Sequence, residues 1–385
     1  VEELTFLNHD VFVISSKPKD RFRGISKDSQ TTERVYRFFP KNLYYILDDN
    51  KHFWPIRLLW HIIDSVTWYG VHRVYTILRD EEPEIMMTHN LKGISLGVAK
   101  EIQRQQIPHI HIVHDLQLIY PSGLLFANKE KISLFLRPFY SFYRMVCKYQ
   151  LGKPDLVIFP SQYLKDVYSD FGFFKNTEVT VMPNPAPRFT PIERGERTPG
   201  PLRLLFVGQL EEHKGIKFLI NSLQKSDINF QLIIAGEGTL KKWLEKITIK
   251  DKRIIYLGYV SLEQLVNCFG LADALVVPSL CYENSPTVIY ESLNAGVPVI
   301  ASDIGGVGEL VEHLENGYLC APGDTQNLLS IISRLDERKE RAVESHIDIK
   351  KTVAPHALHL YAQRLLQYAG IVIERKQKQL LNQKP

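Results

Sequence analysis

The strongest constraint on the fold is an alternation of short apolar runs with amphipathic segments across residues 202–301. Five apolar runs of four to six residues are typical of strands buried between two layers of helices, as in a parallel sheet. We therefore expect a doubly wound α/β domain. The predicted strands are 202–207, 230–235, 254–257, 274–277 and 297–301, and the predicted helices are 216–223, 240–247, 262–269 and 286–294.

The first half repeats this scheme more weakly, and a chain of 385 residues is long enough for two domains. Its predicted strands are 11–15, 85–88, 110–113 and 156–159. Residues 183–200 contain five prolines and no periodicity, which is typical of a linker. The expected units are an N-terminal Rossmann-like domain (1–184), a linker (185–200), a second Rossmann-like domain (201–355) and a helical segment that packs back toward the first domain (356–385). Because the chain begins inside a predicted helix, we expect a first strand and a glycine-rich loop to be missing ahead of it.

Composition excludes several classes of protein. Hydrophobic residues make up 44% and charged residues 23%, which is wrong for a disordered, collagenous or disulfide-stapled chain. No apolar run reaches the ~18 residues of a transmembrane helix. The net charge of +4 is too small to indicate a nucleic-acid partner. Four scattered cysteines, in no Cys-x-x-Cys pair, predict reduced thiols in the core: Cys147, Cys268, Cys281 and Cys320.

Two segments of the first half are unusually aromatic. Residues 36–75 hold 11 aromatic residues, and an apolar stretch over residues 132–151 is interspersed with Arg137, Arg144 and Lys148. One interpretation is a face that binds a membrane surface, or an apolar acceptor site. The other is helices packed on the sheet, with aromatics in the core and cations at its edge. Pro138 favours the second, because it interrupts the helix that a membrane-lying face requires.

The segment 281–298, CYENSPTVIYESLNAGVP, predicts a phosphate-binding helix start. Ser285 is a good N-cap and Pro286 suits the first helical position. The helix follows a strand, so it begins at the carboxyl edge of the sheet, where ligands of such sheets bind. The N–H groups of Ser285, Thr287 and Val288 and the helix dipole would form the seat.

Two carboxylates flank this seat. Glu283 precedes the helix and Glu291 follows eight positions later. Carboxylates accept hydrogen bonds from vicinal hydroxyl groups, so the pair suits a ligand with phosphate in its middle and hydroxylated groups at both ends, such as a nucleotide diphosphate sugar. The alternative is a capped helix with two surface glutamates.

Further turns follow other predicted strands at the same edge. Lys214 stands just beyond the strand 202–207, where it could donate to phosphate oxygens, although a loop lysine is commonly only solvated. Glycine-containing turns follow at residues 236–238 and 303–309. Neither a P-loop nor a complete G-x-G-x-x-G motif is present.

The segment 108–115, PHIHIVHD, predicts a strand that ends in a histidine. Alternation places His109 and His111 on one face and Ile110, Ile112 and His114 on the other. His114 would face a cleft between the domains. No Asp-x-Asp pair occurs in the chain, and we expect no metal site.

The second half resembles the retaining nucleotide-sugar glycosyltransferases of family 4, which have the GT-B fold of two Rossmann-like domains facing a central cleft. The resemblance runs almost continuously over residues 204–324, through FVGQLEEHKG, AGEG, YLGYV, ADALVVPS, ENSPTVIYE, AGVPVIASDIGGVGELV and NGYLCAPGD. The first half is similar more loosely, through NHDVFVIS, PEIMMTHN, HIHIVHDL and DLVIFPSQYL.

The resemblance implies a donor site on the second domain and an acceptor site mainly on the first. Glu283 would touch the donor sugar near the reacting carbon, and Lys214 would stabilise the departing diphosphate. His114 would reach the donor from the first domain. The remaining implied contacts to the nucleotide sugar are Glu291 to the ribose hydroxyls, Tyr259 and Val260 to the base, and Gln209, Asn284, Ser285, Thr287 and Val288 to the rest of the donor.

This chain departs from the family at three places. Gln209 stands where many members have arginine, which removes one of two cations from the diphosphate. Pro286 stands where many have glycine, which removes one N–H group from the seat. The family's amino-terminal glycine-rich loop is expected to be missing from this sequence.

The resulting hypothesis is a retaining, metal-independent hexosyltransferase. Its donor would be a UDP- or GDP-sugar with no other cofactor, and its acceptor a glycan, a lipid-linked sugar or another glycoconjugate, as in polysaccharide biosynthesis. We expect a cytoplasmic protein, either soluble or peripheral on the inner membrane face, with no nucleic-acid partner. The alternatives are a nucleotide-sugar 2-epimerase and a sugar-nucleotide-binding subunit that has lost its catalytic activity.

Overall fold

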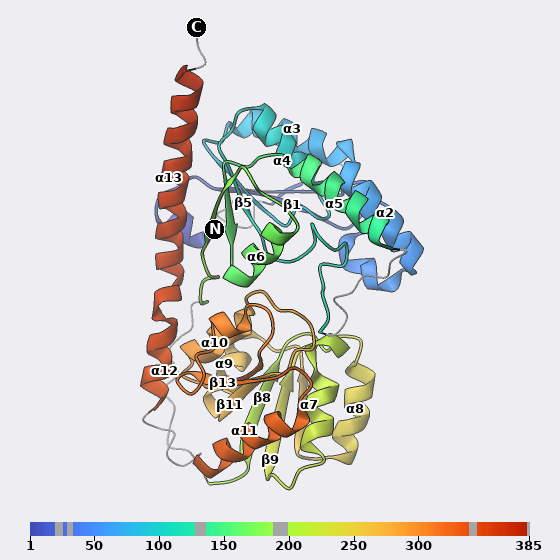
Figure 1. Cartoon of the computed structure of the whole chain (residues 1–385), viewed down its shortest axis with the longest axis vertical. Helices are drawn as coiled ribbons and strands as arrows, with labels where there is room; N and C mark the ends of the chain where they lie inside the picture. The colour runs from blue at the N-terminus through green and yellow to red at the C-terminus, as the bar shows by residue number, and fades with distance from the viewer. Residues whose placement is uncertain (20–25, 29–33, 128–135, 188–198, 339–344, 383–385) are drawn as a thin grey trace.

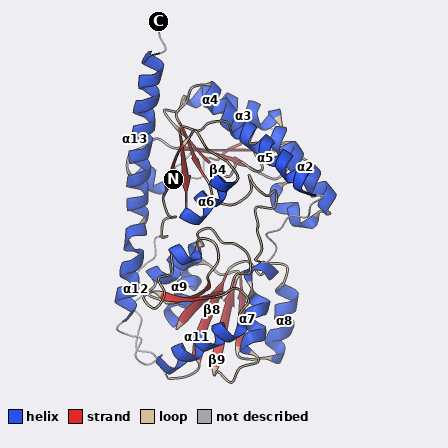
Figure 2. Ribbon diagram, in the orientation of Figure 1, coloured by secondary structure: helices blue, strands red, loops and turns tan. Residues whose placement is uncertain are grey.

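The computed structural model describes residues 1–19, 26–28, 34–127, 136–187, 199–338 and 345–382. Two α/β domains lie one above the other, and the long helix α13 (Leu358–Asn382) runs alongside both (Figure 1). Parallel strands form the centre of each domain and helices cover them (Figure 2). The architecture confirms the predicted α/β class with two Rossmann-like domains.

The second domain is built on a sheet of six parallel strands in the order β10-β9-β8-β11-β12-β13. All five predicted strands are present within one or two residues, because the central ones are mainly apolar runs buried on both faces and the edge strand β10 is still apolar in sequence. A sixth strand, β13, was not predicted. The strands are β8 (Leu202–Val207), β9 (Phe230–Ala235), β10 (Ile254–Gly258), β11 (Ala274–Val277), β12 (Val299–Ser302) and β13 (Gly317–Cys320).

Helices cover both faces of this sheet. The core on one face takes its side chains from α7, α8 and α11, and the core on the other from α9, α10 and α12. This two-sided burial is the reason that the strands read as continuous apolar runs. The helices are α7 (Ile216–Leu223), α8 (Lys241–Lys250), α9 (Leu262–Leu271), α10 (Thr287–Asn294), α11 (Thr325–Arg338) and α12 (Ser345–Val353).

The strands of the first domain form two sheets. The four predicted strands are present within one residue, but β1 belongs to a small sheet with β2 and β3, while the others form the parallel sheet β4-β5-β6-β7. β2, β3 and β7 were not predicted. The strands are β1 (Phe12–Ser16), β2 (Ser26–Asp28), β3 (Arg34–Phe38), β4 (Met86–His89), β5 (His109–Ile112), β6 (Leu156–Phe159) and β7 (Glu178–Val181).

The helices of the first domain include three that take residues from the aromatic segments, α2 and α3 from the first segment and α5 from the second. Pro138 lies in the first turn of α5, where a proline is tolerated, so the prediction that it interrupts this helix is wrong. Part of the aromatic stretch, residues 132–135, lies outside the described residues. The helices are α1 (Glu2–Phe6), α2 (Trp54–Val66), α3 (Trp68–Glu81), α4 (Gly97–Arg104), α5 (Arg137–Leu151) and α6 (Gln162–Asp170).

The last helix, α13, follows the second domain in sequence but packs on the first. Leu365, Ala369 and Val372 share a core with one face of β5 and β6. Lys376 forms an ion pair with Asp155 at 3.1 Å, and Arg375 forms one with Glu178. The chain therefore crosses twice between the domains. Most of the expected linker, residues 188–198, lies outside the described residues.

The four cysteines are free and buried, which confirms them as core thiols. No helix in the described ranges is both long enough and apolar enough to span a bilayer.

Candidate functional site

The two domains meet along loops at the carboxyl ends of their strands. The loop that follows β11 forms two backbone hydrogen bonds with the first domain, Tyr282 N to Leu125 O at 2.8 Å and Ala127 N to Leu280 O at 3.0 Å. The rings of Tyr163 and Tyr282 stack at 5.6 Å. This junction is where the sequence predicted the site.

Lys214 and Glu283 meet directly at the junction. The ammonium Nζ of Lys214 lies 2.6 Å from Glu283 Oε1, and the two side chains are only 28% and 13% exposed. Lys214 ends a short 3-10 helix, η3 (Glu212–Lys214), after β8. Gly215, at φ 77°, lets the next turn lie so close to the β11 loop that a Cβ would be 1.8 Å from Pro278 O. The glycine thus permits the approach that brings the cation to the carboxylate.

Glu283 is held by further contacts. Its Oε1 also accepts a hydrogen bond from Ser279 Oγ at 2.8 Å, and its backbone O accepts one from Gly306 N at 2.7 Å. A Cβ at Gly306 would be 2.1 Å from Asn284 O, so the glycine turn after β12 fits against this loop without room for a side chain. The carboxylate is therefore held in place by contacts within its own domain.

The helix start differs in detail from the prediction. Helix α10 begins at Thr287, with Pro286 at the N-cap, so the prediction that Ser285 caps the helix is wrong. Ser285 Oγ pairs instead with Tyr290 Oη at 2.8 Å, because that buried phenol needs a partner. Thr287 and Val288 remain the first helical residues, whose N–H groups have no partner within the helix.

Glu291 lies in the second turn of α10 and is half-buried. Burial raises the pKa of its carboxyl above the ordinary value. A hydroxyl group that donates a hydrogen bond to such a desolvated carboxylate stabilises its charged form.

Asn284 joins the site to the first domain. Its Nδ2 donates to the backbone O of His114 at 3.0 Å. The His114 ring lies beside that of His89, with Nε2 2.9 Å from His89 Nδ1. Burial lowers the pKa of both rings, that of His89 to about 4, so the pair is neutral at pH 7. One ring then donates its N–H to the other, and each keeps a second nitrogen for a ligand.

The other predicted residues lie farther along the same edge. Gln209 follows β8 and is exposed, Tyr259 follows the edge strand β10 and is 81% exposed, and Val260 is half-buried. Among the described residues no hydrogen bond or ion pair joins Gln209 or Tyr259 to Glu283.

The sequence reasoning missed two residues of the junction. Glu309 accepts from the backbone N–H groups of Gln162 and Tyr163, both at 2.7 Å, and so ties the second domain to the first turn of α6. His89 pairs with His114. Both stood in motifs already noted, MMTHN and GGVGELV, but no spacing rule links them to a partner so distant in sequence.

The histidine-rich strand β5 is structural in its first part. Thr88 Oγ1 lies 2.8 Å from both His109 Nε2 and His111 Nδ1, and both rings are buried. This shared partner confirms that the two histidines lie on one face. In the described residues no three His, Cys, Asp or Glu side chains gather in a way that could hold a metal ion.

Two family models together match most of the chain. The model of Glycosyltransferase Family 4 matches residues 1–187, and the model of Glycosyl transferases group 1 matches residues 190–347. An uncharacterized 42.6 kDa protein in the cps region of Klebsiella pneumoniae is 27% identical over 332 residues, 86% of this chain and 85% of that protein. A glycogen synthase of Mycobacterium tuberculosis is 35% identical over 184 residues, which is 44% of each chain.

Solved structures share the fold. A sucrose-phosphate synthase from Thermosynechococcus elongatus superposes with a TM-score of 0.73 at 20% identity, over 97% of this chain and 92% of that one. The Anabaena protein HepE, in complex with UDP, gives a TM-score of 0.60 at 20% identity, over 78% of this chain and 81% of its own.

Proposed function

Because this chain belongs to the GT4-type glycosyltransferases of the GT-B fold, we propose that it transfers a sugar, with retention of configuration, from a nucleotide diphosphate sugar to a glycan, lipid-linked or other glycoconjugate acceptor. The observation that carries the proposal is the Lys214–Glu283 pair, held 2.6 Å apart beside the start of α10. This arrangement brings one cation, one carboxylate and the first-turn N–H groups of α10 together at one edge of the sheet.

Lys214 and the first turn of α10 would bind the diphosphate. The N–H groups of Thr287 and Val288 and the positive end of the helix dipole favour an anion there. Lys214 Nζ donates to Glu283 Oε1, which holds the ammonium beside this helix start. When the sugar–phosphate bond breaks, negative charge develops on the leaving group, and the ammonium of Lys214 would stabilise it.

Glu283 would act beside the reacting carbon. Its contacts in the described part of the chain all use Oε1, so Oε2 is the oxygen that can accept from a sugar hydroxyl. The carboxylate charge would also oppose the positive charge of an oxocarbenium-like transition state. His114, held near Asn284 by the contact between the domains, would bind the donor sugar from the other side.

The nucleotide would occupy the rest of the edge. Glu291 would accept from the ribose hydroxyls, since its half-buried carboxyl gains from donors. Tyr259 and Val260 would contact the base, and Gln209, Asn284 and Ser285 would complete the donor contacts. HepE, of the same fold, binds UDP, which favours UDP over GDP as the nucleotide of the donor.

We propose that no metal ion takes part, because Lys214 and the helix start supply the positive charge. We place the protein in the cytoplasm, where its four buried and unpaired thiols fit a reducing compartment, with a peripheral contact to the inner membrane face.

The test is nucleotide release by the protein from a panel of UDP-, GDP- and ADP-sugars, in the presence and absence of EDTA. We expect release from one donor class, unaffected by EDTA, and a product whose anomeric configuration by NMR is that of the donor. Isomerised sugar without nucleotide release would indicate an epimerase instead. Ordinary nucleotide affinity without turnover on any acceptor would indicate a binding subunit.

A further inference from the structure

Helices α2 and α5 expose a row of large apolar side chains on one flank of the first domain. On α2 the row is Ile56, Leu59, Ile62 and Val66, and on α5 it is Phe142, Met145 and Tyr149. Each is between 43% and 69% exposed. The residues stand three or four positions apart, so each set occupies one side of its helix. The two helices pack against each other (Figure 1), and we call these seven residues the apolar flank.

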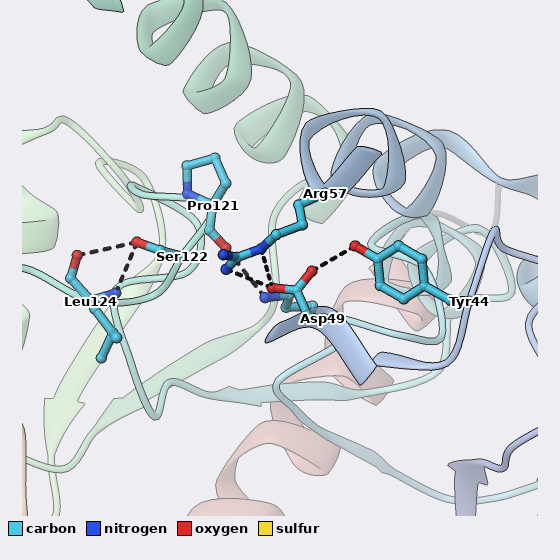
Figure 3. Close-up of polar contacts among 7 residues, drawn as sticks. Tyr44, Asp49, Arg57, Pro121, Ser122 and Leu124 are labelled. Carbon is cyan, nitrogen blue, oxygen red and sulfur yellow. Dashed lines mark hydrogen bonds and ion pairs between the residues drawn. The ribbon is translucent and has the colours of Figure 1, made fainter. Parts of the chain in front are cut away.

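The opposite side of α2 is fixed to the domain, so the apolar flank cannot turn inward. Trp60 is buried, and its Nε1 donates to Tyr44 O at 2.8 Å. Arg57 Nε donates to Asp49 Oδ2 at 3.0 Å, and Asp49 Oδ1 accepts from Tyr44 Oη at 2.7 Å (Figure 3). The core of the domain is thus complete beneath the helix. The interpretation that the aromatic segments only pack on the sheet does not account for the outer row.

The charges around the apolar flank are nearly all positive. Helix α5 carries Arg137, Arg144 and Lys148 and no carboxylate. The one carboxylate of α2, Asp64, is buried and accepts from the Gly93 N–H, and burial raises its pKa to about 7. Solvent therefore meets apolar side chains bordered by cations on these two helices.

A surface hollow adjoins the flank. It has a volume of about 260 Å³, and its lining includes Val66, Trp68, Lys100 and Arg104. Lys100 lies over the ring of Tyr149, which belongs to the apolar flank. Glu101, also in the lining, is buried and paired with Arg104. The hollow thus offers a cation beside an apolar edge, which suits an anionic headgroup whose chains lie on the flank.

We propose that the apolar flank docks on a membrane surface rich in anionic lipid. Apolar side chains would enter the boundary of the acyl chains, while Arg137 and Lys100 would meet the headgroups. Arg144 stands over the Phe171 ring and Lys148 Nζ donates to Phe171 O at 2.6 Å, so these two cations border the flank but are already engaged. A second copy of the chain is a poorer occupant, because pairing two such flanks would bring like charges together.

If the chain is the transferase proposed above, docking of the apolar flank would place its acceptor-binding domain against a lipid surface. Lys92 Nζ donates to Pro121 O at 3.3 Å. The segment that begins at Pro121 continues to the domain junction, where Leu125 O accepts from Tyr282 N. Figure 3 shows Pro121 beside Arg57, with Ser122 and Leu124 following along the chain away from it. A docked flank would therefore hold the junction close to lipid-borne acceptors.

The test is sedimentation of the full chain with vesicles of phosphatidylcholine alone or with one third phosphatidylglycerol. We expect binding to the anionic vesicles, and less of it in high salt. The double variant Leu59→Ser, Met145→Ser should weaken vesicle binding by about tenfold or more, because each side chain leaves the acyl boundary. Lys100→Gln with Arg137→Gln should weaken only the salt-sensitive part. A matched control, Ile249→Ser with Leu314→Ser, removes apolar residues of the second domain that are more exposed than Leu59 and Met145, and it should bind as the wild type does.

Absence of vesicle binding, or an equal loss in the control, would overturn the proposal. A dimer in lipid-free solution that Leu59→Ser, Met145→Ser dissociates would also overturn it, in favour of a second copy. Each variant is checked for an unchanged melting temperature. Vesicle binding requires no donor and no catalysis, so its failure is distinguishable from failure of the nucleotide-release assay.

Discussion

The two sides of the domain junction handle charge differently. The second domain contributes an ammonium and two carboxylates from Lys214, Glu283 and Glu291. The first contributes a backbone O and a pair of neutral imidazoles, those of His89 and His114. A donor diphosphate would therefore be neutralised wholly from one side. The first domain would instead form hydrogen bonds with hydroxyl groups, because a neutral imidazole can act as either donor or acceptor.

The largest effect should follow from removing the central carboxylate. We expect Glu283→Ala to lower the transfer rate by about 100- to 1,000-fold, the scale of losing one preorganised electrostatic group at a transition state. The measurement is initial rate at saturating donor, with circular dichroism to verify the fold.

The matched control is Glu212→Ala, an exposed glutamate of the same domain that pairs only with Lys217 at 3.2 Å in the described structure. It should retain full activity. If Glu283→Ala stays within a few-fold of wild type, the carboxylate has no part in the mechanism.

Acid should weaken the first domain by a few kcal/mol. Burial lowers the pKa of His61 to about 4, of His109 to about 3, and of His111 well below 6.5. The unfolded chain takes up these protons as pH falls below 6.5, whereas the folded domain does not, so stability is lost. At pH 5 the loss is about 2 kcal/mol each for His61 and His109. Asp64, whose pKa is raised to about 7, takes up a proton in the folded state as the pH falls. This uptake stabilises the folded domain and offsets the stability lost through about one histidine.

Urea unfolding at pH 7 and pH 5, followed by tryptophan fluorescence, checks this prediction. In Trp243→Phe the remaining tryptophans all belong to the first domain. We expect its midpoint to fall at pH 5. A midpoint that holds or rises would show that the buried histidines are not the dominant groups.

Removing the cation should weaken nucleotide binding on the second domain alone. We expect Lys214→Ala to lower the affinity for the free nucleoside diphosphate by ~1–3 kcal/mol, the scale of a charged hydrogen bond. Isothermal titration calorimetry measures it. Lys217→Ala, which removes a nearby lysine, serves as the control and should bind normally; an unchanged Kd for Lys214→Ala would contradict the role.

The smallest effect should come from the contact that ties the two sides together. Glu309→Gln removes a charged acceptor from the Gln162 and Tyr163 N–H groups and should cost about 1 kcal/mol of the docked arrangement. We expect kcat/KM to fall a few-fold with nucleotide affinity unchanged, because the donor contacts lie on one domain. Glu312→Gln, on the exposed surface nearby, should change neither; a loss of nucleotide affinity in Glu309→Gln would place this carboxylate in the donor site instead.

The sequence predicted the second domain well because its strands are buried on both faces. Runs such as 274–277 are apolar and buried throughout, so composition alone marks them. Strand β3, RVYRF, carries two arginines and lies in a small separate sheet, and β7, EVTV, is half-exposed, so neither has that signal. Their positions depend on long-range pairing.

The site was predicted where neighbours in sequence form it and missed where they do not. Glu283, Thr287 and Glu291 stand in one motif, and Lys214 follows a recognisable strand. The Ser285 cap failed because a buried tyrosine competes for the same hydroxyl, which depends on packing. The exposure of the apolar flank also depended on packing, since only the buried Trp60 and Arg57 side of α2 shows which side faces outward.

The position of α13 has a consequence for biosynthesis. One face of the sheet β4-β5-β6-β7 is covered by a helix that leaves the ribosome only after both domains have been made. During translation Ile110, Ile112 and Ile158 therefore stay exposed until α13 has been made. The second domain contains all its own helices, so it can already complete its core at that point. The first domain can therefore complete its core only after the second domain has been made, the reverse of the usual order in which the domain made first also matures first.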